Sequence, residues 1–223
     1  MNNKSSKNID ILVVAGGWSN EREVSLLSGK NVFQCLKKNN YKVKFLDLDK
    51  KNVNSIFKFK PDVIFNALHG QFGEDGYIQT ILDRFKVPYT HSGVIASSIA
   101  MDKDISKKIF KKNNINTPKF FTYSFDLKNK YLLKKIGKKL KFPVVVKPLN
   151  EGSSVNVYIC NKKNIGIILK KLKNYKIVMI EEFIGGREIQ VAIMGNKKLG
   201  AIELKPKRKF YDYEAKYNTS AKT

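Results

Sequence analysis

A lysine and two serines stand close together in segment 142–157, FPVVVKPLNEGSSVNV, where they could bind an anion. Lys147 ends an apolar run that predicts a buried strand, and Ser153 and Ser154 follow in a turn that also contains a glycine. A lysine ammonium, free backbone N–H groups and hydroxyls are the groups that hold nucleotide phosphates in proteins. The alternative is an ordinary β-hairpin, in which the turn leads into a second strand over residues 155–160.

Two other chemically capable groups follow glycine turns nearer the N-terminus. Glu21 lies in GGWSNE, directly after an apolar strand predicted over residues 9–15. It could grip an ammonium group at the edge of a sheet, or it could be an acid that complements the dipole of the next helix. His69 opens the loop HGQFGEDG after another predicted strand, the usual place for a ligand in an open α/β sheet. A loop histidine with satisfied hydrogen bonds is the alternative.

The first hundred residues alternate strands with helices, which predicts a parallel α/β sheet. Ser19 or Asn20 could cap the first helix, because Asn20 and Glu23 have the spacing of a capping box. GGWSNE lacks the GxGxxG spacing, so a dinucleotide fingerprint is not supported. The expected strands span residues 9–15, 41–48, 61–68 and 87–89, with helices near 24–36, 53–59 and 78–85 and a helix pair or one interrupted helix over 92–113.

From about residue 115 the pattern changes to that of an α+β unit. Residues 188–194 and 199–204 alternate like antiparallel strands around the turn Gly195-Asn196. The aromatic and charged segment 210–217, FYDYEAKY, has no core periodicity and is predicted to be a surface loop. The other expected strands span residues 119–122, 144–147, 155–160 and 178–182, with helices near 130–140 and 164–172.

The composition is that of a basic protein that can bury a substantial core, with a formal net charge of +24 over 223 residues. Only four of the 43 basic residues are arginine and the lysines are scattered, so we interpret the charge as a solvated surface without a specific nucleic-acid interface. A nucleic-acid-binding protein is the alternative and would bind DNA or RNA in a salt-sensitive way. Cys35 and Cys160 stand alone, and no apolar run approaches the roughly 18–20 residues that span a bilayer, so a cytoplasmic protein without membrane insertion is expected.

Six segments in a fixed order together closely resemble the D-alanine–D-alanine ligase family of the ATP-grasp superfamily. They are GGWSNEREVSLLSG, ALHGQFGEDGYIQ, YTHSGVIASSIAMDK, VVVKPLNEGSSV, EEFIGGRE and FYDYEAKY. The resemblance runs from about residue 9 to 220. It implies an N-terminal parallel-sheet (pre-ATP-grasp) domain over residues 1–100 that binds substrate. An ATP-grasp domain would follow, with a central subdomain at 101–180 and the start of a C-terminal subdomain at 181–223.

The resemblance also implies a reaction. Ligases of this family use ATP to phosphorylate the carboxylate of one D-alanine. The amine of a second D-alanine attacks the acyl phosphate, which gives D-alanyl-D-alanine for peptidoglycan synthesis. Mg²⁺ or Mn²⁺ would assist, and a homodimer formed through the N-terminal half is expected. The alternatives are a relative that uses D-lactate and an inactive nucleotide-binding fragment.

Site residues carry over from the resemblance position by position. Glu21 would bind the ammonium of the first D-alanine, and His69 would lie near its carboxylate. Ser153 would hydrogen-bond to Glu21 and Tyr217, and these three residues would form the catalytic set, without a serine nucleophile. The other matched positions are expected to bind ATP through its phosphates (Lys103, Lys147, Ser154, Val155, Lys216), its adenine (Glu181, Glu182, Phe183, Ile184) and its ribose (Glu188).

The chain departs from the family pattern in two respects. Asn156 stands where GSSVG would have its last glycine, and we expect the loop to survive because Asn tolerates a positive φ. The family's metal ligands and an oxyanion-binding arginine would come after Thr223. The sequence is therefore interpreted as a C-terminally truncated ligase with no metal ligands of its own. The 223-residue chain alone is expected to have little ligase activity.

Overall fold

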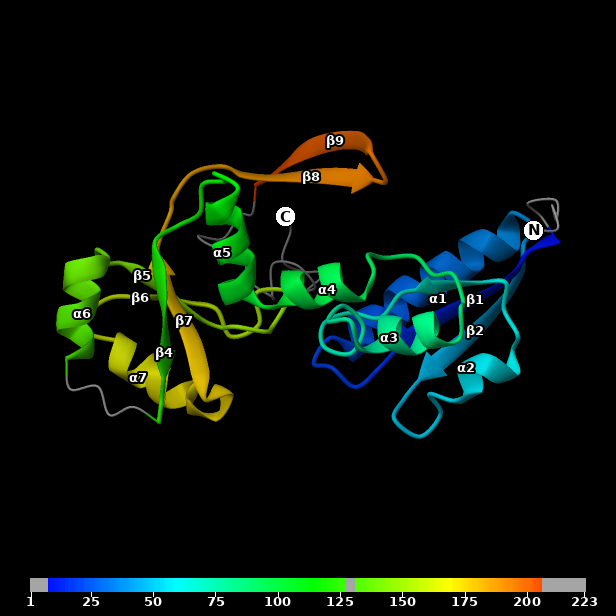
Figure 1. The fold of residues 1–223 in the computed structure, drawn as a ribbon, viewed down its shortest axis with the longest axis horizontal. Coiled ribbons are helices and arrows are strands. Elements are labelled where there is room, and N and C mark those ends of the chain that lie inside the picture. Colours follow the sequence, from blue (N-terminus) through cyan, green and yellow to red (C-terminus); the bar gives the residue numbers. More distant parts are fainter. Residues whose placement is uncertain (1–7, 127–130, 206–223) are drawn as a thin grey trace. The chain divides into compact units, whose positions relative to one another are not determined.

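The computed structural model describes residues 8–126 and 131–205, which fold as two compact units (Figure 1). The units divide between Ser106 and Lys107, inside helix α5 (Lys103–Lys112). The first unit has a parallel sheet, and the second has antiparallel sheets. This arrangement agrees with the predicted sequence of an α/β unit followed by an α+β unit.

Unit 1 is built on a three-stranded parallel sheet with the order β2-β1-β3. Ile11 pairs with Val43 on one side and with Val63 on the other, so β1 is the central strand. The prediction of a strand over residues 87–89 is wrong, because Tyr89 makes only a single isolated parallel bridge, with Ile64. The elements are β1 (Asp10–Gly16), α1 (Arg22–Lys38), β2 (Lys42–Leu48), α2 (Ser55–Lys58), β3 (Val63–Asn66), α3 (Tyr77–Arg84) and α4 (Val94–Met101).

Strand β1 is buried on both of its faces, as its continuous apolar sequence predicts. Successive side chains point to opposite faces of a strand. Leu12 and Val14 therefore pack into one apolar cluster, and Val13 and Ala15 pack into another. Helix α1 lies against the second cluster and approaches most closely at Gly29, where a Cβ atom would collide with the side chain of Ala15.

The start of α1 differs from the predicted capping box. The helix begins at Arg22, its N-cap residue is Glu21, and the Glu21 side chain makes no capping hydrogen bond. The Ser19 hydroxyl instead accepts a 3.1 Å hydrogen bond from the Glu21 amide and donates a 2.7 Å bond to the carbonyl oxygen of His69. Ser19 thus joins the two glycine-containing loops of unit 1.

The sequence predicted either a pair of helices or one interrupted helix over residues 92–113. The structure has two helices there, α4 and α5. Asp102 separates them in an extended conformation, with φ −84° and ψ 105°. Its carboxylate accepts hydrogen bonds of 2.9 and 3.0 Å from the amides of Asp104 and Ile105. Asp102 therefore ends one helix and caps the next, as aspartate commonly does.

Unit 2 contains an antiparallel four-stranded sheet with the order β4-β7-β5-β6. The pairing of β5 with β6 confirms the hairpin interpretation, although β6 begins at Tyr158 and the loop before it is longer than predicted. The elements are β4 (Phe120–Ser124), α6 (Leu132–Lys139), β5 (Val144–Pro148), β6 (Tyr158–Cys160), α7 (Ile165–Lys171), the 3-10 helix η2 (Lys173–Tyr175) and β7 (Ile177–Glu182).

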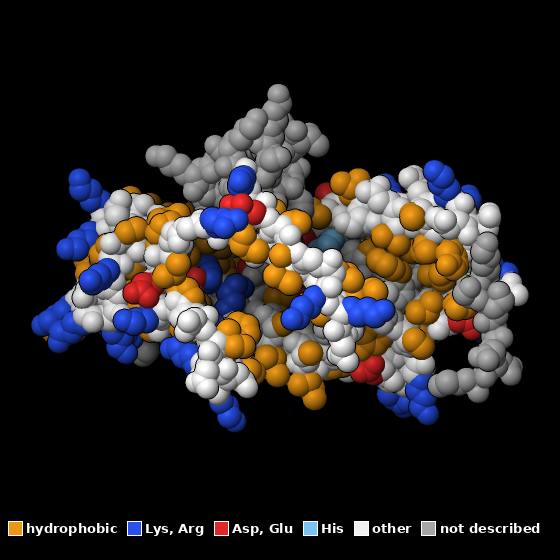
Figure 2. All heavy atoms as spheres, turned by 90° about the horizontal axis from the view of Figure 1, so that it is seen from above, with side chains coloured by type: hydrophobic (Ala, Val, Ile, Leu, Met, Phe, Trp, Pro, Cys, Tyr) orange, Lys and Arg blue, Asp and Glu red, His pale blue; other side chains and the backbone are white. Residues whose placement is uncertain are grey.

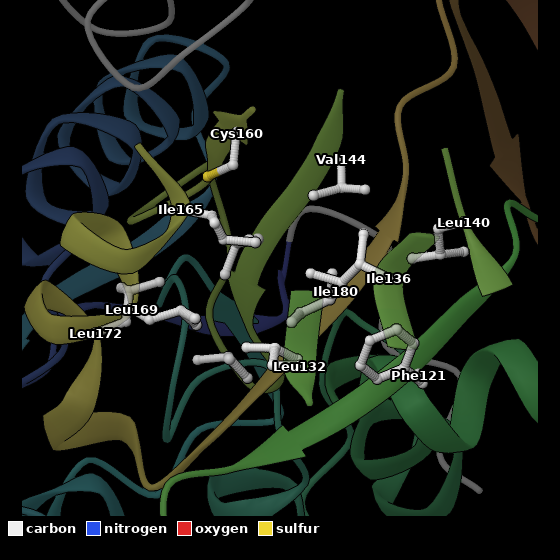
Figure 3. Packing of buried hydrophobic residues seen from close by; sticks show 12 residues of the cluster. Phe121, Leu132, Ile136, Leu140, Val144, Cys160, Ile165, Leu169, Leu172 and Ile180 are labelled. Carbon is white, nitrogen blue, oxygen red and sulfur yellow. The ribbon is translucent and has the colours of Figure 1, made fainter. Parts of the chain in front are cut away.

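The core of unit 2 lies between this sheet and the helices α6 and α7 (Figure 3). Leu132 and Ile136 of α6 and Leu169 of α7 share one buried cluster with Val144 and Ile180 of the sheet. The cluster fixes β5 and β7 side by side, and these two strands carry Lys147 and Glu181.

A second, two-stranded sheet follows β7. Strands β8 (Glu188–Met194) and β9 (Lys197–Leu204) pair antiparallel with an irregularity between Ala192 and Ile193. They confirm the hairpin predicted around Gly195-Asn196. Most side chains of both strands are exposed, including Val191 and Ile202.

Lysine and arginine side chains are dispersed over the face seen in Figure 2, which fits the scattered lysines of the sequence. None of the helices in the described parts of the chain combines the length and apolar character needed to cross a membrane.

Candidate functional site

The loops at the carboxyl ends of β1 and β3 bring Glu21 and His69 to the same edge of the parallel sheet. Glu21 is only 2% exposed, and its Oε2 lies 2.5 Å from the position that a Cβ atom would occupy at Gly70. Gly70 also has φ +67°, which favours glycine. The glycine after His69 is therefore needed for two reasons, backbone conformation and space for the carboxylate.

Two side chains contact the imidazole of His69. The Ser28 hydroxyl lies 3.1 Å from Nε2, and Oε1 of Glu74 lies 3.6 Å from Nδ1. The other Glu74 oxygen accepts a 2.8 Å hydrogen bond from the Gly70 amide. Ser28 stands on α1 and Glu74 on the His69 loop, so a helix and a loop hold the ring together.

Glu74 and His69 shift each other's titration. The hydrogen bond to Glu74 raises the pKa of His69 above its ordinary value, against the opposing effect of partial burial. Burial alone would raise the pKa of Glu74, but hydrogen bonds from His69 and from the Gly70 amide hold that pKa below its ordinary value. The edge thus combines the carboxylate of Glu21 with an imidazole whose pKa is raised by its bond to Glu74.

Two buried amide side chains support the His69 loop. Asn66 Nδ2 and Gln79 Nε2 donate hydrogen bonds of 3.0 and 2.8 Å to the carbonyl oxygen of Gly73. The Asn66 side-chain oxygen accepts a 3.1 Å bond from the Leu68 amide. Sequence reasoning missed both amides, although a polar residue inside the apolar run PDVIFNAL was an available signal for Asn66.

A second group of candidate site residues belongs to unit 2 and is centred on Glu181 of β7. One carboxylate oxygen of Glu181 accepts a hydrogen bond from the ammonium of Lys147, and the other accepts one from Lys107. Lys147 stands on β5 and Lys107 on α5. Three elements therefore meet at one carboxylate.

Lys107 was missed by the sequence reasoning, which assigned phosphate binding to Lys103 and Lys147. Its ammonium lies 4.9 Å from the centre of the Phe120 ring as well as next to Glu181. Burial lowers the pKa of Lys107, although the hydrogen bond and charge of Glu181 oppose that shift. The available signal was helical spacing, since Lys107 follows Lys103 by one turn of α5.

The loop after Lys147 has the conformation expected of a compact turn. Ser153, Ser154 and Asn156 have φ values of +47°, +60° and +55°. The positive φ of Asn156 confirms the expectation that Asn can stand where the resembling family has glycine. Its side chain donates a 2.7 Å hydrogen bond to the Tyr175 hydroxyl and accepts a 3.0 Å bond from the Tyr158 hydroxyl.

The other predicted site residues are not gathered into either of these two groups. Glu182 accepts a 3.3 Å hydrogen bond from the Lys119 amide, and Phe183, Ile184 and Glu188 are exposed. Lys103 is the first residue of α5, and Val155 lies in the loop with Ser154, its amide bonded to the Gly152 carbonyl at 2.9 Å. Lys216 and Tyr217 lie outside the described residues. The structure thus brings Glu21 to His69 and Lys147 to Glu181.

A metal site is not formed by the residues in ranges 8–126 and 131–205. No group of three or more His, Cys, Asp or Glu side chains gathers there in a way that could hold an ion. The described residues by themselves therefore do not form a site for Mg²⁺ or Mn²⁺.

Comparison with known proteins gives one consistent result. A family model described as the D-ala D-ala ligase C-terminus matches residues 109–223, and one described as the D-ala D-ala ligase N-terminus matches residues 53–92. The D-alanine–D-alanine ligase of Pelagibacter ubique is 66% identical over 213 residues, which cover 96% of this chain and 70% of the relative. That of Zymomonas mobilis is 45% identical over 96% of this chain and 66% of its own length.

Solved structures agree with the sequence comparisons. The crystal structure of the D-alanine–D-alanine ligase from Bacillus anthracis matches with a TM-score of 0.80 and 36% identity, over 93% of this chain and 68% of that one. A structure of the same ligase complexed with ATP matches with a TM-score of 0.76 and 32% identity, over 91% of this chain. The chain spans about two thirds of the length of these relatives.

Proposed function

This chain belongs to the D-alanine–D-alanine ligase family, and we propose that it binds ATP and D-alanine for the ATP-dependent joining of two D-alanines. The observation that carries the proposal is the placement of Lys147. It stands at the end of a buried strand, beside the buried carboxylate of Glu181 and directly before the glycine- and serine-containing loop. A cation followed by a glycine- and hydroxyl-containing loop at one strand end suits the binding of a triphosphate. The solved relative with bound ATP supports the same nucleotide.

We assign the first D-alanine to the edge that carries Glu21 and His69. The carboxylate of Glu21 binds the ammonium of the amino acid, and the imidazole of His69 binds and orients its carboxylate. A fixed orientation matters because an oxygen of that carboxylate must attack the γ-phosphorus of ATP. The P–O bond to ADP breaks, and the electron pair leaves with ADP.

The other chain groups stabilise charge. Lys147 reduces the repulsion between the attacking carboxylate and the triphosphate, because its ammonium neutralises part of the phosphate charge. Ser154 and Val155, in the loop after Lys147, are assigned to the phosphate oxygens. The amine of the second D-alanine then attacks the acyl carbon, and the bond from that carbon to the phosphate oxygen breaks. The amine loses a proton as the peptide bond forms, and the departing phosphate takes it up. Glu181, Glu182, Phe183 and Ile184 are assigned to adenine, Glu188 to ribose, and Lys103 and Lys216 to phosphate.

Further features of the proposal come from the resemblance alone. Mg²⁺ or Mn²⁺ would neutralise phosphate charge when bound. Tyr217 would join Glu21 and Ser153 in the catalytic set, the enzyme would be a homodimer, and it would act in the cytoplasm for peptidoglycan synthesis. Residues 1–100 would form the substrate-binding domain, and residues 101–180 and 181–223 the two parts of the ATP-grasp domain.

The direct test is D-alanine-dependent release of ADP by the protein as its cell makes it, with the dipeptide identified by mass spectrometry. D-Alanine should support ADP release, whereas L-alanine and D-lactate should not replace it. Lys147→Ala should weaken ATP binding, and Lys112→Ala, at an exposed position, is the matched control for loss of one positive charge. ADP release that ignores D-alanine, or ATP binding that survives Lys147→Ala unchanged, would contradict the proposal.

A further inference from the structure

The Glu181 carboxylate is shared by two lysines, one on each oxygen. Lys147 bonds to Oε1 and Lys107 bonds to Oε2. The proposed function gives Lys147 a phosphate to bind, and an ammonium that turns toward a phosphate loosens its bond to Glu181. Whether the Glu181 carboxylate then keeps a cationic partner depends on Lys107.

The two lysines are not equally buried. The side chains of Lys107 and Glu181 are each 8% exposed, whereas that of Lys147 is 19% exposed. A carboxylate left in such surroundings without a cation pays a large desolvation cost. Lys147 is the lysine of the two with more access to solvent, so it is the one that can turn toward a ligand while Lys107 stays with Glu181.

Lys107 is also held from a second direction. Its ammonium lies 4.9 Å from the centre of the Phe120 ring, and that of Lys111 lies 4.8 Å from the same ring. Phe120 is the register partner of Glu181 across β4 and β7. The ring and the carboxylate are therefore fixed to each other by the sheet, and Lys107 is positioned by both.

The local charge favours an anion. Lys107 and Lys147 face one carboxylate, with Lys111 nearby on the same ring, so positive charge exceeds negative charge at this point. The charge of Lys147 and that of Lys111 both lower the pKa of Lys107, although burial is the larger cause. A triphosphate beside Lys147 would offset this excess.

We propose that Lys107 is a positioning residue of the nucleotide site, which keeps Glu181 paired and thereby releases Lys147 to bind the triphosphate of ATP. This inference rests on the proposed function. Lys107 does not touch the nucleotide in this arrangement; it acts through Glu181. Without Lys107, Lys147 is the remaining partner of the buried carboxylate among the described residues, and the carboxylate holds it away from the phosphates.

The test measures the affinities for ATP and for adenosine by calorimetry in the wild-type protein and in Lys107→Met. Lys112→Met, at an exposed position of the same helix, is the control. Lys107→Met should weaken ATP binding about tenfold, within the usual range of coupling in one ion-pair network, and leave adenosine binding within about twofold. Lys112→Met should change neither. Unchanged adenosine binding also shows that the variant is folded.

A second background separates positioning from direct contact. With Glu181→Gln the charge that retains Lys147 is gone, so adding Lys107→Met should change the ratio of ATP to adenosine affinity less than about twofold. An equal loss of ATP and adenosine binding in Lys107→Met would reduce Lys107 to a structural residue and overturn the inference. A tenfold loss of ATP affinity in the Glu181→Gln background would mean direct contact and would also overturn it. Wild-type protein that binds neither ligand would instead refute the proposed function itself.

Discussion

The Ser25 hydroxyl of α1 donates a 2.7 Å hydrogen bond to the carbonyl oxygen of Ala67, just after β3. The same hydroxyl accepts a 2.8 Å bond from the amide of Gly16 at the end of β1. One fully buried serine thus joins the helix to both strand ends from which the loops of Glu21 and His69 depart.

Ser25→Ala should therefore destabilise unit 1 more than the loss of a surface hydroxyl would. Two buried backbone groups lose their partner, and each such group costs about 1–3 kcal/mol, so we expect a loss of about 2–6 kcal/mol in the free energy of unfolding. Chemical denaturation measures it. Ser92→Ala, at an exposed position of the same unit, is the control and should change stability by less than about 0.5 kcal/mol. Equal effects of the two substitutions would refute the role of Ser25.

The pairing of His69 with Glu74 predicts a specific titration. Because folding raises the pKa of His69, this residue contributes to the free energy of unfolding at pH values below the ordinary histidine value of 6.5. That contribution is lost as pH rises through the pKa of the folded state. Because the pKa of Glu74 is lowered, its share is present above 4.5 and is lost as pH falls through the folded pKa. The pair therefore stabilises the protein between those two folded pKa values.

This titration is accessible to NMR because the chain has only two histidines. The imidazole resonance of His69 should titrate above pH 6.5 and move to lower pH in Glu74→Gln. His91→Gln assigns the second resonance and serves as the control. A His69 resonance that titrates at the same pH with and without the Glu74 carboxylate would contradict the pairing.

Gly70→Ala should displace the Glu21 carboxylate. A Cβ atom would lie 2.5 Å from Oε2 of Glu21, and the φ of +67° disfavours alanine. We expect a loss of about 1–3 kcal/mol in stability together with weaker D-alanine binding. Gly137→Ala in α6 is the matched control, since a Cβ atom there meets nothing within 4 Å and should stabilise the helix by up to about 1 kcal/mol. D-Alanine affinity that survives Gly70→Ala unchanged would separate Glu21 from the substrate site.

Asn156 should limit the motion of the loop after Lys147. Asn156→Gly removes the hydrogen bonds to Tyr175 and Tyr158 and adds backbone freedom, so the amides of residues 152–157 should exchange hydrogen faster. Tyr175→Phe removes one of the two bonds without altering the loop backbone and should give an intermediate rate. Exchange rates that are the same in all three proteins would show that the tyrosines do not restrain the loop.

The two cysteines should differ in reactivity. Cys35 is exposed, whereas burial raises the pKa of Cys160 to about 11. At pH 8 a thiol reagent should label one thiol per folded chain and none in Cys35→Ser. Labelling of Cys160 should appear only as unit 2 unfolds, which makes it a probe of that core. Rapid modification of Cys160 in the folded Cys35→Ser protein would be inconsistent with its burial.

Much of the fold could be predicted because local pattern and tertiary structure agree. The apolar run of β1 and the alternation in β8 and β9 were sufficient to identify these strands. The strand predicted at Tyr89 failed because its backbone forms one bridge and no ladder. The capping box of Asn20 and Glu23 failed because α1 begins at Arg22, which places Glu21 at the N-cap position. Ser19, the other predicted cap, bonds instead to the carbonyl of His69, fifty positions away.

The same distinction applies to the candidate site. Glu21, His69 and Lys147 were identifiable because each follows or ends a predicted strand. Lys107 was not, because it is one lysine in a basic helix and its partner Glu181 lies 74 positions later. Long-range partners of this kind leave no local pattern.

The order β4-β7-β5-β6 has a consequence for synthesis on the ribosome. Strand β7 is the last of these four strands to be made, yet it lies inside the sheet, with Phe120 of β4 on one side and Val145 of β5 on the other as partners of Glu181. Until β7 emerges, β4 has no strand to pair with, and one edge of β5 is unpaired. Unit 1 can fold while this happens, since all of its strands come earlier in the chain. The nascent protein therefore acquires its parallel sheet first. Lys107 and Lys147 can pair with Glu181 only after β7 has been synthesised.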